Sequence, residues 1–198
     1  MSAVATRVRR SRSQLLLLAL MFFAPLLLAF LVYYGSQWRP LSRTNHGTLI
    51  EPPRPLPRLS LPRADGSLAA EGVLIGRWSL LYVAAGDCDA ACHASLYFMR
   101  QTYLGMGNLI PRLQQVFLAT GPCCDRAFLG REHPDLLTLD AGGEAAAPWL
   151  SRIPADARAN TLFLIDPRGN LMMRYDAHRD PRGLHEDLKK LLDLSHIG

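Results

Sequence analysis

The sequence predicts an α/β protein, a sandwich of helices around a mixed central sheet, preceded by one transmembrane helix. Two observations carry this prediction. Residues 15–34 contain no charged side chain, and this run is long enough to cross a bilayer. In the last two thirds of the chain, short apolar runs alternate with amphipathic stretches, as strands and helices do in α/β folds. We therefore divide the chain into a basic tail (1–13), a transmembrane helix (14–34), a proline-rich stalk (35–63) and an α/β domain (64–198).

The arginines around the apolar run predict its orientation. Four arginines lie between residues 7 and 12, whereas only Arg39 and Arg43 follow the run closely. Because positive charge is retained on the cytoplasmic side, we expect a cytoplasmic N-terminus and a C-terminal domain outside the cytoplasm. A cleaved signal peptide is the alternative, but its apolar core would be shorter and a small-residue cleavage site would follow it.

The charge distribution argues against a nucleic-acid partner. The formal net charge is +5, but the first 34 residues contribute four arginines and no acidic residue. This leaves about +1 for the rest of the chain, which offers no basic face for phosphate contacts. The basic tail is instead a topology signal.

The segments after the span are predicted from proline content and apolar periodicity. Six prolines between residues 40 and 62 favour an extended, semi-rigid tether. Apolar runs then predict strands at 78–83, 116–118, 136–139 and 162–165. Residues 166–170 form a Pro-Gly turn that leads into a paired strand at 171–175. Helical patterns are found at 91–103, 125–130, 145–152 and 181–194, the last with a clear apolar face.

Cys88 and Cys92 are the first candidate site, because they lie where the first apolar strand gives way to a helix. Residues four apart in a first helical turn share one face, and the N–H groups exposed there stabilise a thiolate. Such a pair binds a soft metal or closes a disulfide. Cys88 precedes the helix and is expected to be the more exposed nucleophile, and Asp89 is expected to cap the helix.

Cys123 and Cys124 are the second candidate site. They follow the second predicted strand, at the sheet edge where open α/β sheets place their sites and where Cys88 also lies. A bond between adjacent cysteines is strained, so pairing across to Cys88 or Cys92 is an equal alternative. Four converging sulfurs would also hold a metal without histidine, whereas the simplest alternative is two small residues in a turn after Pro122.

Three features resemble the Sco/SenC family of membrane-anchored cytochrome c oxidase assembly proteins: Cys88-x-x-x-Cys92, the sequence Leu-Phe-Leu-Ile-Asp-Pro-x-Gly at 162–169, and the terminal helix. The resemblance implies a thioredoxin-like fold, a bacterial inner-membrane location and a periplasmic domain. It implies copper binding by Cys88 and Cys92. The partners that it implies are an oxidase subunit or other assembly factors.

The chain departs from this family, and from thioredoxins, before the late strand. Arg158 stands where the family has its ligand histidine, and arginine has no lone pair to donate to a metal. Asn160 stands where thioredoxin-fold reductases have a cis-proline. Copper binding would therefore need a substitute ligand, and the candidates besides Cys123 and Cys124 are His93, Met99, Met106, His133 and His178.

Three functional hypotheses follow from these residues and the resemblance. The first is an accessory factor in cytochrome c oxidase biogenesis that handles copper, or the redox state of metal-site cysteines, through Cys88 and Cys92. The second is a general periplasmic thiol-disulfide oxidoreductase, which would make the protein an enzyme. The third is a docking module whose cysteines only staple a loop.

Overall fold

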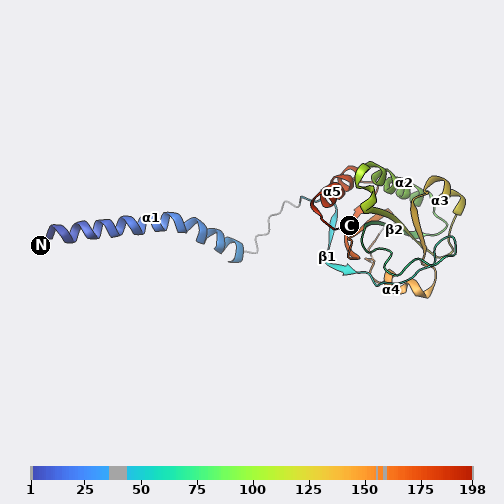
Figure 1. The fold of residues 1–198 in the computed structure, drawn as a ribbon, viewed down its shortest axis with the longest axis horizontal. Coiled ribbons are helices and arrows are strands. Elements are labelled where there is room, and N and C mark those ends of the chain that lie inside the picture. Colours follow the sequence, from blue (N-terminus) through green and yellow to red (C-terminus); the bar gives the residue numbers. More distant parts are fainter. Residues whose placement is uncertain (1, 36–43, 155, 158–159, 198) are drawn as a thin grey trace. The chain divides into compact units, whose positions relative to one another are not determined.

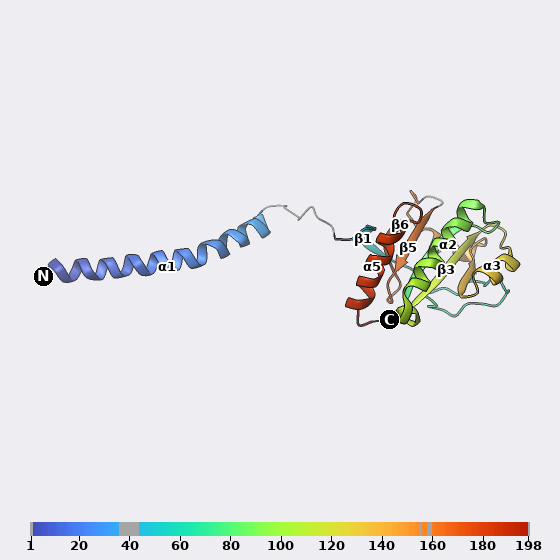
Figure 2. The ribbon, with the colours of Figure 1, turned by 90° about the horizontal axis from the view of Figure 1, so that it is seen from above.

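The computed structural model describes residues 2–35, 44–154, 156–157 and 160–197, which fall into two compact units divided between Arg43 and Thr44. The first unit contains helix α1 (Ser2–Gly35), the long helix in Figures 1 and 2. Its stretch Gln14–Gly35 has 22 residues and is long and apolar enough to cross a membrane. The side chains of this stretch are exposed, as expected of a helix whose apolar surface faces lipid.

The second unit is built on a mixed sheet of six strands in the order β1-β6-β5-β2-β3-β4. Strand β2 is parallel to β3, and β3 is parallel to β4, whereas the β2–β5, β5–β6 and β6–β1 pairs are antiparallel. The bounds of the strands are β1 (Thr48–Pro55), β2 (Trp78–Ala85), β3 (Leu113–Thr120), β4 (Leu136–Asp140), β5 (Thr161–Ile165) and β6 (Asn170–Asp176). This confirms the α/β class and the mixed sheet.

Helices cover both faces of the sheet. Helices α2 (Ala90–Gly105) and α5 (Pro181–Leu194) lie side by side on one face, and α3 (Arg126–Glu132) lies beyond them near the β3–β4 end (Figures 1 and 2). Helix α4 (Ala147–Leu150) lies on the opposite side (Figure 1). Two short 3-10 helices, Gly107–Arg112 and Glu144–Ala146, complete the fold.

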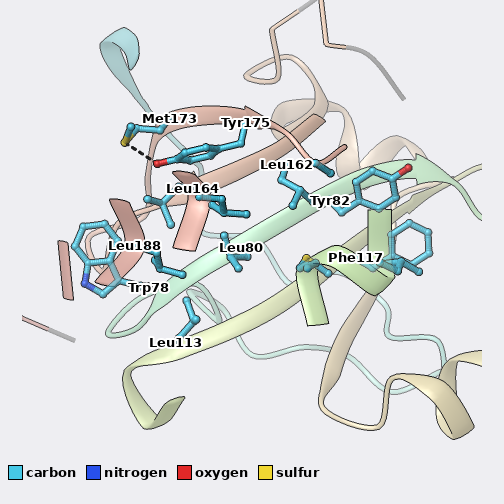
Figure 3. Packing of buried hydrophobic residues seen from close by; sticks show 14 of the residues in the cluster. Trp78, Leu80, Tyr82, Leu113, Phe117, Leu162, Leu164, Met173, Tyr175 and Leu188 are labelled. Carbon is cyan, nitrogen blue, oxygen red and sulfur yellow. Dashed lines mark hydrogen bonds between the residues drawn. The ribbon is translucent and has the colours of Figure 1, made fainter. Parts of the chain in front are cut away.

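Alternation along β2 builds a separate apolar layer on each face of the sheet. Leu80 and Tyr82 pack with Phe117 and Leu188 on the side of α2 and α5 (Figure 3). Leu81, between them in sequence, belongs to the other layer, with residues of β1, β5 and α4. Successive side chains of a strand point to opposite faces, so a strand between two layers is apolar throughout.

The predicted stalk is wrong over its second half. Residues 48–55 form the edge strand β1, which pairs with β6, and the Leu56 N–H donates to the Gly169 oxygen at 2.9 Å. Leu61 is buried, so the domain begins near residue 44 and not at 64. Prolines are tolerated in an edge strand because one row of its backbone groups has no sheet partner to bond. Residues 36–43 lie outside the described part of the chain.

A buried carboxylate fastens the first residues of the domain to α5. Asp187 accepts hydrogen bonds from the backbone N–H of His46 at 2.7 Å and of Gly47 at 3.0 Å. The same oxygen accepts from the Tyr175 hydroxyl at 3.1 Å. Burial and the neighbouring carboxylate raise the pKa of Tyr175, which therefore stays protonated and donates. The segment that precedes β1 is thus held by charge-assisted hydrogen bonds.

Candidate functional site: two disulfides at one edge of the sheet

The first pair of cysteines forms a disulfide at the junction of β2 and α2. Cys88 and Cys92 are bonded, with Cα atoms 5.1 Å apart. Asp89 is the N-cap of α2, as predicted, and its carboxylate accepts from the Cys92 N–H at 2.9 Å. Cys88 therefore lies before the cap and not in the first helical turn. Its φ of 43° places it in the left-handed region, a strained conformation for a residue with a side chain.

Both cysteines of this pair are shielded from solvent. Cys88 is 7% exposed and Cys92 is 2% exposed, so the expected greater exposure of Cys88 is present but small. Both lie in the apolar layer beneath α2. Little of this pair is therefore open to a bulky partner.

The second pair lies at the end of β3. Cys123 and Cys124 are bonded to each other, with Cα atoms 3.3 Å apart, so the structure adopts the adjacent pairing and not a bond across to Cys88 or Cys92. Both residues are half-buried and pack against the same apolar layer as the first pair. Their neighbours Pro122 and Asp125 are exposed.

The two cysteine-bearing loops touch through their backbones. Parallel pairing sets Ala85 opposite Thr120, and the Gly86 N–H donates to the Thr120 oxygen at 2.9 Å. A Cβ atom at Gly86 would lie 2.8 Å from the Cys123 Cα atom and 2.9 Å from the Pro122 carbonyl carbon. Glycine is therefore required sterically here, because any side chain would push the two loops apart.

Aromatic rings join the helices that follow the two pairs. His93, next to Cys92, stacks on Phe128 of α3 with ring centroids 4.1 Å apart and planes 8° apart. His133 meets the other side of this arrangement edge-on, 5.4 Å from Phe128. Burial, and to a lesser degree the charge of Arg100, lowers the pKa of His133. The stack of His93 on Phe128 holds the start of α3 close to the start of α2. Because Cys124 immediately precedes the N-cap of α3, the loop that carries Cys124 is held there as well.

The other candidate ligands are spread over the domain. Met99 and Met106 are buried in the apolar layer, where they serve as core residues. His178 is exposed, and its Nε2 atom lies 3.5 Å from the Ser95 hydroxyl, one turn beyond Cys92. Asn160 lies near His178, because the Asn160 carbonyl accepts a hydrogen bond at 2.9 Å from the N–H of Ala177, the residue before His178. Arg158 lies outside the described residues.

No ready-made metal cluster is found in the described part of the chain. Among these residues, no three His, Cys, Asp or Glu side chains gather as a metal would require. The cysteines are disulfide-bonded, and a disulfide sulfur carries no thiolate charge. Reduction would supply two soft donors at Cys88 and Cys92, a donor type that suits Cu(I).

Sequence comparison identifies the family of this domain. A family described as "transmembrane-like, thioredoxin-like, C-terminal domain" matches residues 78–195, which is more than half of the chain. The chain belongs to this family. The match begins at β2 and ends just after α5, so this transmembrane-like, thioredoxin-like domain contains both disulfides. No curated protein matches the sequence.

Solved structures share the fold of this thioredoxin-like domain at low sequence identity. Copper-bound ScoI of Bradyrhizobium japonicum is 18% identical, with a TM-score of 0.55 over 67% of this chain and 96% of that one. Apo Sco1 of Thermus thermophilus is 19% identical, with a TM-score of 0.59 over 76% and 99%. Copper-bound yeast Sco1 is 16% identical, with a TM-score of 0.61 over 72% and 91%. The chain therefore has a Sco-like thioredoxin fold with an apolar N-terminal helix.

Proposed function

We propose that this protein is a membrane-anchored accessory factor in the biogenesis of cytochrome c oxidase, or of another haem-copper oxidase. It acts by thiol–disulfide exchange through Cys88 and Cys92, on cysteines that receive copper. The proposal includes a bacterial inner-membrane location, with the domain in the periplasm. The Cys88–Cys92 disulfide at the start of a 16-residue helix is the observation that carries it.

The position of the pair suits reversible exchange. When the bond is reduced, Cys92 lies in the first turn of α2, where the positive end of the helix dipole favours a thiolate. Cys88 is outside the helix, in a strained backbone conformation, and is the sulfur that we assign as nucleophile. Its thiolate would attack a partner disulfide, and Cys92 would then resolve the mixed disulfide. Two electrons pass from Cys88 and Cys92 to the partner.

Single cysteine variants test this proposal in the full-length protein in detergent. With a disulfide-bonded peptide as substrate, Cys88→Ser is expected to abolish reduction, and Cys92→Ser to accumulate a mixed disulfide. Ala127→Ser, an exposed position on α3, is a control that leaves both pairs intact. Turnover by Cys88→Ser at the wild-type rate would refute the exchange function.

Copper handling is the second candidate, with the metal as cargo. It is favoured by the fold shared with copper-bound ScoI and Sco1 and by the soft donor set that reduction would create. The reduced protein would then bind about one Cu(I) per chain, lost when Cys88 and Cys92 are both serine. Loss of that copper in His178→Ala would identify the third ligand. A docking module would instead keep its function in cells with both cysteines replaced.

A further inference from the structure

We propose that Cys123 and Cys124 form a second redox centre that relays electrons from a partner's dithiol to the Cys88–Cys92 disulfide. This inference rests on the redox function proposed above for Cys88 and Cys92. It assigns a role to the vicinal disulfide, which the exchange reaction at the first pair does not use. The partner's chemistry is that of a protein dithiol donor.

The backbone contact brings the two pairs within reach of each other. Gly86 lies against the backbone of Pro122 and Cys123. In the sequence, Gly86 is two residues before Cys88. The strands that lead into the loops are in register up to their last pair, Ala85 and Thr120. Because the sheet fixes one side of each loop, neither pair moves far from the other without breaking this contact.

The stack of His93 on Phe128 is a second contact between the two segments, made by the helices α2 and α3 that follow the cysteine-bearing loops. His93 follows Cys92 directly, and Phe128 lies four residues after Cys124. Two contacts therefore link the segments that carry the cysteines. One is the backbone contact of Gly86 with Cys123, and the other is the ring stack of His93 on Phe128. The parallel strands β2 and β3 and this ring stack therefore place both disulfides at the same apolar cluster.

The vicinal pair is more exposed to solvent than the Cys88–Cys92 pair, as a relay from an outside donor requires. Cys92 is 2% exposed and Cys88 is 7% exposed, whereas Cys123 and Cys124 are half-buried in a loop with exposed neighbours. Thiol–disulfide exchange needs the attacking thiolate to reach a sulfur atom. A protein-sized donor would therefore meet the vicinal pair first, and the vicinal pair packs against the apolar cluster that contains Cys88 and Cys92.

The relay balances in electrons, protons and bonds. A donor dithiol reduces the Cys123–Cys124 disulfide and becomes a disulfide itself, leaving two thiols on the chain. One vicinal thiolate then attacks the Cys88 sulfur, the more exposed of the Cys88–Cys92 bond, which forms a mixed disulfide to Cys88 and releases Cys92 as a thiolate. The second vicinal thiolate resolves the mixed disulfide, which restores the Cys123–Cys124 bond. Two electrons and two protons have moved to Cys88 and Cys92.

The test compares reduction rates in the oxidised full-length protein in detergent. Reduced thioredoxin, a protein dithiol, is the probe. Timed samples are alkylated and mapped by mass spectrometry. In the wild type, label is expected first at Cys123 and Cys124 and then at Cys88 and Cys92. In Cys123→Ser/Cys124→Ser, label at Cys88 and Cys92 is expected at least about tenfold more slowly. A smaller slowing overturns the relay, and Ala127→Ser, at an exposed position on α3, serves as the control.

Unfolding does not imitate this result, because a loosened domain would expose the buried pair and speed its reduction. Trapping gives a second readout. Cys92→Ser/Cys124→Ser and Cys92→Ser/Cys123→Ser each leave one cysteine per loop, and at least one of them is expected to form an intramolecular disulfide to Cys88. Failure of both also overturns the relay. If Cys88→Ser stops substrate reduction while the relay tests fail, the proposed function stands without the relay.

Discussion

Replacement of Gly86 by alanine is the sharpest structural test of the two-disulfide site. The new Cβ atom would lie 2.8 Å from the Cys123 Cα atom, whereas carbon atoms in contact are ordinarily about 3.5–4.0 Å apart. The loops must therefore separate by roughly 1 Å. The obstructing atoms are backbone and do not rotate away, so we expect a loss of about 1–3 kcal/mol in the free energy of unfolding, the usual range for overpacking.

Urea unfolding followed by circular dichroism measures this loss, and Gly130→Ala is its control. Gly130 lies in α3, and a Cβ atom there meets nothing within 4 Å. Alanine at this helical position is expected to stabilise by about 0.5–1 kcal/mol. If the relay operates, Gly86→Ala also slows thioredoxin-driven reduction of Cys88 and Cys92. An unfolding midpoint equal to that of the wild type would refute the close contact between the loops.

Three further predictions concern the rest of the domain. Asp187→Ala leaves three hydrogen-bond donors without their acceptor and is expected to cost roughly 1.5–3 kcal/mol in urea unfolding. Trp149→Phe removes the bond from the indole N–H to the Pro57 oxygen (2.7 Å) and should cost about 1 kcal/mol, because residue 57 belongs to the domain. Burial lowers the pKa of His133, so the unfolded state gains protons first as the pH falls below 6.5. Stability should fall through that range, and less steeply in His133→Gln than in His196→Gln, an exposed control.

Most of the architecture could be predicted because the strands and helices follow apolar periodicity. The run at 78–83 became β2, and the amphipathic stretch at 181–194 became α5 with the predicted bounds. Strand β1 was missed because three prolines lie within Thr48–Pro55, and proline argues against a strand in any interior position. Only its place at the sheet edge, which sequence alone does not reveal, makes this composition acceptable.

The site was harder to predict than the fold. The Asp89 cap followed from its position before the helix, and the placement of both cysteine pairs at one edge followed from the order of parallel strands. The backbone contact at Gly86 depends on the register between β2 and β3, and the local sequence carries no signal for it. The burial of His133, which is 6% exposed and lies edge-on to Phe128, likewise has no signal in the local sequence.

The proposed copper handling and the proposed disulfide exchange would be successive states of one site and need not be rival functions. Cu(I) takes thiolate ligands, and a disulfide has none, so Cys88 and Cys92 would need two electrons before they could bind the metal. Their burial, at 7% and 2% exposure, slows direct reduction by a bulky donor. A half-buried second pair, whose loop is in backbone contact with Gly86 in the loop of the first, would answer that difficulty. If both proposals hold, the vicinal disulfide would control when the first pair becomes able to receive copper, and regulation would act at that part of the site.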